Sequence, residues 1–193
     1  IAKTPPVWIY DAASNRWDTY QHWPQSCAQG CAQASVPLYL HADQTLRGTQ
    51  DNSGAQYAEY VSDPAKPVPF VPRPVDMGDR ATWTTWLVRD QRFVDGRTDV
   101  LSYTSAELTA PVKLAGVPVA HLFASTSGSD SDWVVKLIDV YPDQYPDDPK
   151  MAGYELPIAL TIFRGRYREG FDAPKALASD QPLTYSFDLP NVN

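Results

Sequence analysis

The sequence is poor in the residues that most often carry chemistry or contact nucleic acid. Its 193 residues include only two cysteines, three histidines and two methionines, and 23 acidic residues outnumber 16 basic ones. The resulting net charge of −7 argues against a nucleic-acid partner, because such partners usually require a basic face. No apolar run approaches the roughly 18 residues that a membrane helix needs, so no membrane partner is expected either.

Recognisable catalytic motifs are also missing. The Gly-x-Ser-x-Gly nucleophile motif is absent, as is a glycine-rich phosphate loop. The nearest string, residues 128–132 (Gly-Ser-Asp-Ser-Asp), fails the calcium-loop pattern too and is predicted to be a solvated hairpin turn. The histidines lie far apart and are predicted to be structural or surface side chains: His22, His41 and His121. We therefore expect no catalytic residue, metal site or cofactor in this chain.

The two cysteines stand close together in the string Cys27-Ala28-Gln29-Gly30-Cys31. Three intervening residues do not make the common redox motif, and one pair supplies too few ligands for a structural zinc. Two interpretations stay open: a pair of free buried thiols, or a small disulfide loop with Gly30 at its bend. A bridge would imply an oxidising compartment such as a periplasm.

Short apolar and β-branched runs between turn signals favour an all-β protein with antiparallel sheets packed face to face. In one of them Trp133, Val135 and Leu137 share a face, and the other face is expected to be partly wet. Sustained helical spacing is absent, and residues 79–83 are the best candidate for a short helix. The predicted strands are residues 7–10, 36–41, 82–88, 100–104, 112–114, 119–125, 133–141, 156–163 and 183–189.

A proline-rich segment, residues 63–74, has five prolines in twelve residues and cannot form a central strand. It is expected to run along a surface, either as an ordered connection between sheets or as a rigid carrier of Phe70 and Met77 into a neighbouring cleft. Trp83 and Trp86 would share one face if their segment is helical. If the segment is extended, they project to opposite sides. In either case they are core residues, or one of them lines an apolar ligand pocket.

Charged residues gather in two places. An acidic loop surrounds Asp143, Asp147 and Asp148, and a basic run covers residues 164–168. We expect the loop to be exposed and the basic run to pair with carboxylates of its own domain on a solvent face.

Several strings together resemble the Xaa-Pro dipeptidyl-peptidase C-terminal domain. Within that family, they look most like the α-amino-acid ester hydrolases, which belong to the cocaine esterase-like α/β-hydrolases. The similar strings are residues 63–69, 90–92 with Arg97, 99–104, 132–142 and 164–168; residues 62–75, 83–87, 90–97, Trp17-Asp18 and the Cys27 and Cys31 pair point to the ester hydrolases.

The resemblance implies an antiparallel jelly-roll β-sandwich of the galactose-binding-like type, with long Pro-rich loops. Such a domain accompanies an α/β-hydrolase domain that holds a Ser-His-Asp triad, and the parent enzymes hydrolyse or transfer α-amino acyl groups, including β-lactam antibiotic side chains. No triad residue falls in this sequence. The expected contribution is a pocket wall formed by Phe70, Met77, Trp83 and Trp86, with Trp83 foremost. Arg92, Arg97, Arg164 and Arg166 are expected to form fold or interface ion pairs.

The resemblance also sets expectations for the larger protein. Residues 1–35 would be a linker from a hydrolase domain with an entry loop, and residues 36–193 a jelly roll incomplete at its C-terminus. The missing strands would come from a separate or cleaved chain. The start, Ile1 to Pro6 without Met, is typical of a fragment or processed chain. We expect a periplasmic or secreted homo-oligomer acting on small α-amino acid esters or β-lactams. The alternative is a freestanding jelly-roll module that binds carbohydrate or another ligand.

Overall fold

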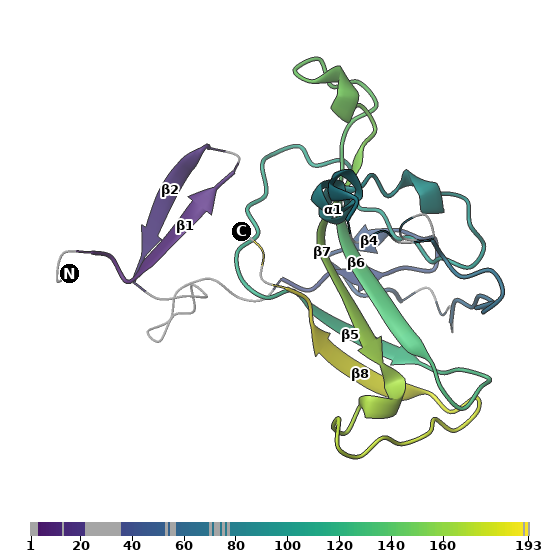
Figure 1. Ribbon diagram of the computed structural model, residues 1–193. Helices are drawn as coiled ribbons and strands as arrows, with labels where there is room; N and C mark the ends of the chain where they lie inside the picture. The colour runs from purple at the N-terminus through teal and green to yellow at the C-terminus, as the bar shows by residue number, and fades with distance from the viewer. Residues whose placement is uncertain are drawn as a thin grey trace. The chain divides into compact units, whose positions relative to one another are not determined.

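The computed structural model describes residues 4–12, 14–21, 36–52, 54, 57–69, 71, 74, 76, 78–190 and 192. Most of their regular secondary structure consists of β-strands (Figure 1). The chain divides into two compact units. The first contains Ile1–Ala28, Lys113–Val140 and Leu156–Asn193, and the second contains Gln29–Val112 and Tyr141–Glu155. In the described residues no helix has the length and apolar character needed to span a bilayer.

The first unit contains a hairpin and two further strand pairs. Strand β1 (Val7–Asp11) pairs antiparallel with β2 (Arg16–Tyr20). Strand β5 (Val119–Ala124) pairs antiparallel with β8 (Leu183–Asp188), and β6 (Asp132–Val140) pairs with β7 (Glu155–Arg164). The 3-10 helix η4 (Gly165–Tyr167) follows β7 directly.

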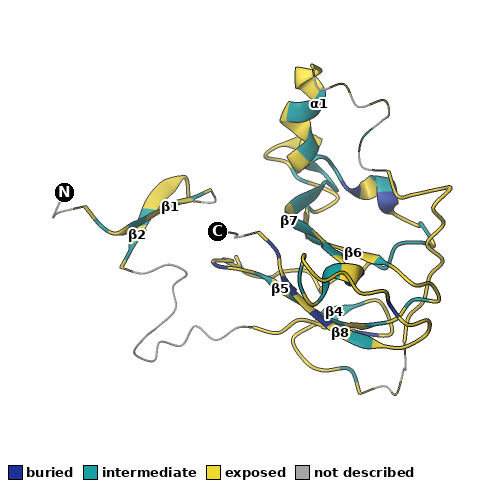
Figure 2. Ribbon diagram, turned by 60° about the horizontal axis from the view of Figure 1, so that its bottom comes forward, coloured by how far each residue is buried: buried dark blue, intermediate teal, exposed yellow. Residues whose placement is uncertain are grey.

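Alternation along β8 and β5 builds the core between the two strand pairs. Tyr185 and Phe187 of β8 are buried, and their neighbours in the strand are exposed (Figure 2). Phe163 of β7 stacks on Phe187 with ring centroids 4.8 Å apart, and Trp133 of β6 lies 5.4 Å from Tyr185. The two pairs therefore pack face to face as a sandwich, because each buries one side of its pleat.

The predicted faces of residues 133–140 are confirmed. Trp133, Val135 and Leu137 pack against the buried clusters of the sandwich. On the opposite face Val134 and Val140 are more than half exposed, as expected for a partly wet side. The strands expected at residues 7–10, 119–125, 156–163 and 183–189 are also present, each within one or two residues of its predicted ends.

The second unit is held by short elements. Strand β3 (Tyr39–Leu40) pairs antiparallel with β4 (Leu46–Arg47), and an isolated parallel bridge joins Thr45 to Thr104. Its helices are α1 (Arg80–Thr85), η1 (Trp86–Val88), η2 (Arg92–Val94) and η3 (Pro149–Met151).

Several strand predictions were wrong. Residues 82–88 are helical, because Asp79 caps a helix whose first turn begins at Arg80; the predicted helix at 79–83 is the correct assignment. Residues 36–41 shrink to the two-residue β3, and in residues 100–104 only the bridge at Thr104 remains. Residues 112–114, just after Pro111, are exposed and form no strand.

The turn at residues 128–132 is exposed as predicted, but it is not a hairpin turn. It connects β5 to β6, which pair with different strands. Two acidic residues of this turn bind the basic run instead: Asp130 lies 2.6 Å from the Arg166 guanidinium, and Asp132 lies 3.6 Å from that of Arg164. The expected pairing of the basic run within its own domain is thereby confirmed.

Candidate functional site

The short helix α1 and the 3-10 helix η1 that follows it carry the two tryptophans that the sequence indicated as pocket-wall residues, Trp83 in α1 and Trp86 at the start of η1. The start of α1 is specified by Asp79, whose carboxylate accepts hydrogen bonds from the amides of Ala81 (3.0 Å) and Thr82 (3.3 Å) and from the Thr82 hydroxyl (2.6 Å). A side chain in this position satisfies amides that have no partner within the helix. The Thr82 hydroxyl and these amides hold the pKa of Asp79 below its usual range, so the cap is ionised at neutral pH.

Trp83 and Trp86 lie on the same side of the segment and contact each other. Their rings meet edge to face, with centroids 5.6 Å apart and an interplanar angle of 78°, as the spacing of three predicts for a helix. Neither residue is buried, and α1 contains no buried residue at all. The interpretation of these tryptophans as core residues is therefore wrong. They are half-buried aromatic residues in a helical segment that otherwise consists of exposed and half-buried residues (Figure 2).

Exposed apolar side chains follow Trp86 in η1. Leu87 is 62% exposed and Val88 is 48% exposed. The indole Nε1 of Trp83 is shielded from solvent, and none of the described residues offers it a hydrogen-bond acceptor. We call Trp83, Trp86, Leu87 and Val88 the α1 apolar surface. Exposed apolar side chains that gather beside aromatic rings are typical of interaction sites.

A hydrogen-bonded clamp fixes the chain that follows the α1 apolar surface. The Tyr154 hydroxyl donates to the carbonyl of Val88 at 2.5 Å. The amide of Gln91 donates to the Glu155 carbonyl at 3.0 Å, and the amide of Glu155 donates to the Asp90 carboxylate at 3.3 Å. Gln91 is fully buried, and its side-chain amide donates to the carbonyl of Arg89. The clamp thus ties residues 88–91 to residues 154–155.

The two carboxyl groups of the clamp, those of Asp90 and Glu155, have pKa values shifted in opposite directions. Burial disfavours ionisation of Asp90, but hydrogen bonds from the Arg92 guanidinium and from the amides of Arg92 and Glu155 outweigh it and lower the pKa of Asp90. The Arg92 Nε lies 2.8 Å from Asp90 Oδ2. Burial and the nearby carboxylates of Asp95 and Asp90 raise the pKa of Glu155. Asp90 is consequently the carboxylate that anchors the clamp, and Glu155 contributes mainly its backbone.

The arginines of this unit play the structural part that the resemblance implied. Arg92 pairs with Asp90, and Arg97 pairs with Asp99 through two hydrogen bonds of 2.8 and 2.6 Å. Arg97 also donates to the carbonyl of Lys66 in the proline-rich segment at 3.4 Å. These contacts hold the loop that follows η2 and connect it to residues 63–66.

The remaining predicted site residues fall outside the part of the chain that the structure describes. This concerns the wall candidates Phe70 and Met77, and also Cys27, Cys31 and His22. The two other histidines lie as expected. His41 is buried with its Nε2 2.7 Å from the carbonyl oxygen of Thr49, and His121 is exposed on β5.

Sequence reasoning missed two parts of this site. One is Tyr154, which the sequence presents only as part of the connection after the acidic loop. The other is the exposed pair Leu87 and Val88, which the strand predicted at residues 82–88 did not place on one surface with the tryptophans. A capping Asp79 three residues before Thr82 was the local signal for a helix, and hence for a shared face. In the described residues no three His, Cys, Asp or Glu side chains gather as a metal site would require.

Known proteins resemble most or all of this chain. The model of the X-Pro dipeptidyl-peptidase C-terminal non-catalytic domain matches residues 1–193. The chain belongs to this family. A solved α-amino acid ester hydrolase, labelled with selenomethionine, superposes with a TM-score of 0.91 at 61% identity over 99% of this chain and 31% of its own. The family and the antiparallel β-sandwich expected from the sequence are thus confirmed.

Other relatives agree with this assignment. A solved aminopeptidase from a marine sediment Thaumarchaeota archaeon superposes with a TM-score of 0.88 at 45% identity, over 97% of this chain and 30% of its own. A cocaine esterase of Rhodococcus sp. (strain MB1 Bresler) is 30% identical over 98% of this chain and 31% of its own. A putative serine esterase of Mycobacterium bovis is 28% identical over 74% of this chain and 21% of its own.

As an X-Pro dipeptidyl-peptidase C-terminal non-catalytic domain, the chain spans about a third or less of the length of these relatives. Such a domain implies a catalytic domain in the same polypeptide as its partner. In the α1 apolar surface the predicted wall residues Trp83 and Trp86 are half-buried and precede the exposed Leu87 and Val88.

Proposed function

We propose that this domain serves a serine hydrolase that hydrolyses or transfers α-amino acyl esters, β-lactam antibiotic side chains among them, and that its α1 apolar surface forms one wall of the acyl pocket. The half-buried edge-to-face pair of Trp83 and Trp86, followed by the exposed Leu87 and Val88, carries the proposal. The 61% identical neighbour is an α-amino acid ester hydrolase, and this supports the substrate class.

In this proposal the bond-breaking groups belong to the catalytic domain. An activated serine attacks the ester carbonyl, an oxyanion hole holds the tetrahedral intermediate, and water or an amine accepts the acyl group. The β-domain contributes the apolar wall, which packs against the acyl side chain and positions it. Asp79 and the clamp from Tyr154 hold that wall rigid, and a rigid wall costs less entropy when the substrate binds.

Replacing Trp83 with alanine in the full-length enzyme tests this role. An aromatic contact contributes about 0.5–1.5 kcal/mol beyond its buried area, so we expect KM for a phenylglycyl ester to rise by about two- to tenfold. The value of kcat should change little, because the reacting groups lie elsewhere. Steady-state kinetics with phenylglycyl and alanyl esters measure both values.

The matched control is Thr84→Ala, which alters an exposed residue of the same helix and leaves the aromatic pair intact. This variant should retain wild-type kinetics. If Trp83→Ala has unchanged kinetics with every acyl group, Trp83 does not line the pocket and the wall proposal fails.

We further propose a periplasmic or secreted location, which rests on the Cys27 and Cys31 pair. An oxidising compartment would let the two thiols close a small loop. Alkylation of the protein purified without reductant, followed by peptide mass spectrometry, should then find both cysteines blocked. Two fully alkylated thiols would contradict the proposed location. A homo-oligomer is proposed for the full protein, and light scattering at known concentration measures it.

A freestanding carbohydrate module receives no comparable support. Sugar-binding platforms need flat, exposed aromatic faces, and the half-buried rings of Trp83 and Trp86 meet edge to face at 78°. The family match also places the chain with non-catalytic domains of larger enzymes.

A further inference from the structure

The β1–β2 hairpin has two unlike faces. Its register places Trp8 opposite Thr19 and Tyr10 opposite Trp17. Side chains of directly opposite residues point to the same side of a sheet. One face therefore carries these four residues, which we call the hairpin aromatic face, and it contains no charged side chain. The other face carries Val7, Ile9, Asp11, Arg16, Asp18 and Tyr20.

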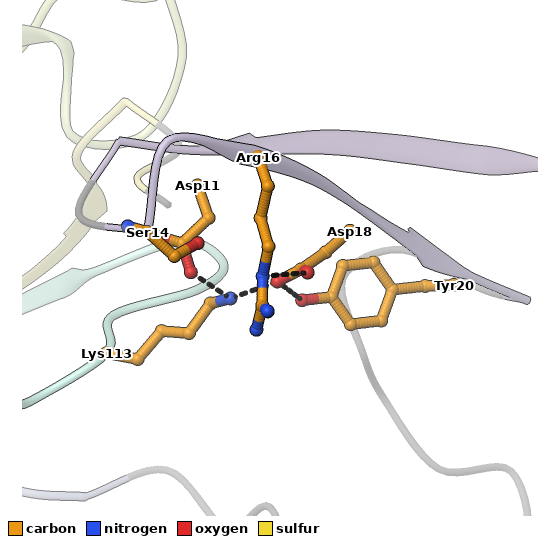
Figure 3. Close-up of polar contacts among 6 residues, drawn as sticks. All are labelled: Asp11, Ser14, Arg16, Asp18, Tyr20 and Lys113. Carbon is orange, nitrogen blue, oxygen red and sulfur yellow. Dashed lines mark hydrogen bonds and ion pairs between the residues drawn. The ribbon is translucent and has the colours of Figure 1, made fainter.

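The carboxylates of the charged face pair with a lysine of the same unit, Lys113. The Lys113 ammonium lies between two carboxylates, 2.9 Å from Asp11 Oδ2 and 2.6 Å from Asp18 Oδ2 (Figure 3). The Tyr20 hydroxyl donates to Asp18 at 3.3 Å. Asp11 and Asp18 keep only 17% and 23% of their side-chain surface exposed. This side of the hairpin is thus already occupied.

The aromatic face is exposed and already ordered. Trp8 is 50% exposed, Tyr10 41% and Trp17 60%. Trp17 contacts both other rings, with centroids 6.4 Å from Trp8 and 5.4 Å from Tyr10 and interplanar angles of 61° and 62°. The Tyr10 hydroxyl donates to the side chain of Asn15 in the turn. Aromatic enrichment and absence of charge are the composition of a protein-interface core.

The length of the relatives and the place of this domain in their chains favour the catalytic domain as the occupant of this face. The relatives are about three times as long as the matched segment, and the family's domain is the C-terminal one. In the relatives' chain order, the hairpin at residues 7–20 is therefore the described element nearest to the catalytic domain. The edge-to-face rings offer an irregular surface that suits protein side chains better than a flat sugar ring.

We propose that Trp8, Tyr10 and Trp17 form a docking surface for the catalytic domain of the same polypeptide, separate from the α1 apolar surface. The inference rests on the proposed accessory role, because its occupant is the catalytic domain. Docking there would hold the two domains together.

Cysteine labelling in the full-length enzyme tests the docking. Thr19→Cys places a thiol on the hairpin aromatic face, and Ser127→Cys places one on an exposed turn of the same unit as a control. Maleimide labelling of each position is followed over time by peptide mass spectrometry. A covered thiol at position 19 should react about tenfold more slowly than the thiol at position 127, because reaction then requires the interface to open.

A second variant shows whether the rings hold the interface. Adding Trp8→Ser and Trp17→Ser to Thr19→Cys should bring its labelling rate to that of the control. Adding Phe171→Ser, which alters an 86% exposed ring elsewhere in the unit, should leave the thiol at position 19 protected.

Three outcomes would overturn the proposal: equal labelling of Thr19→Cys and Ser127→Cys, protection that survives loss of both tryptophans, and protection that disappears on dilution, which would identify a second copy as the occupant. Labelling does not depend on turnover. Free labelling of Thr19→Cys beside a raised KM in Trp83→Ala would therefore refute the docking and leave the pocket-wall function in place.

Discussion

Lys113 governs the electrostatics of the hairpin at the scale of single residues. Its ammonium group donates to two carboxylates at once, and each of these contacts raises the pKa of Lys113. The hydrogen bond from Lys113, together with that from the amide of Ser14, lowers the pKa of Asp11 to about 2. The pKa of Asp18 shifts in the same direction, with Lys113 again the largest cause.

This shift predicts a pH dependence. Because the pKa of Asp11 is lower in the folded protein than its ordinary value of 3.8, the ion pair stabilises the hairpin above about pH 4. The stabilisation is lost as the pH falls toward about 2. Lys113→Met should return the pKa of Asp11 toward its ordinary value, which carboxyl carbon shifts in an NMR titration would report.

The control for this titration is Lys175→Met, which removes a lysine that pairs with Glu169 and not with the hairpin. It should leave the low pKa of Asp11 unchanged. A pKa of Asp11 that stays near 2 in Lys113→Met would show that the turn amide, and not the lysine, is responsible.

At the scale of elements, the strands of the sandwich could be predicted from the sequence, whereas only the first strand of the hairpin could. Residues 7–10 show an apolar pattern that predicts β1. The partner β2 reads Arg-Trp-Asp-Thr-Tyr, and its polar residues hide the strand from any search for apolar runs. It forms because Asn15 takes a left-handed backbone conformation, with φ of 53°, and brings β2 back along β1. Asn tolerates that conformation better than most residues.

Gly165 at the junction of β7 and η4 offers a test at this scale. A Cβ at this position would lie 2.8 Å from the Ser131 carbonyl oxygen and 3.1 Å from Leu177 Cδ1. The amide of Gly165 also donates to that same carbonyl at 2.9 Å, so the backbone cannot simply move away. Gly165→Ala should therefore lower the free energy of unfolding by about 1–3 kcal/mol, as measured by urea denaturation.

Gly128→Ala is the matched control, because a Cβ there would meet its nearest atoms at 3.7 Å, an ordinary contact distance. The urea concentration at the midpoint of its unfolding should stay close to that of the unaltered protein. Equal midpoints for both alanine variants would mean that the β6–β7 end of the sandwich yields to the added methyl group at little cost.

At the scale of the whole molecule, burial is concentrated in one unit. The described residues contain seven buried hydrophobic residues, and only Val94 belongs to the second unit. That unit is held by the short pair of β3 and β4, by ion pairs and by the clamp around Asp90, and it presents Leu87, Val88 and Leu108 to solvent. So small a buried core is typical of a unit that packs against a larger partner.

The sequence by itself determined the features that depend on neighbours in the chain. Alternation along residues 133–140 set the faces of β6. Asp90 and Asp99 each pair with an arginine two positions away in the sequence. The tertiary structure alone decided the contacts between distant residues. Lys113 meets Asp11 across 102 positions, and Tyr154 holds Val88 across 66. The physical reason is that a lysine or a tyrosine has many equivalent partners in an unfolded chain, and only the folded path of the backbone brings one of them within hydrogen-bonding distance.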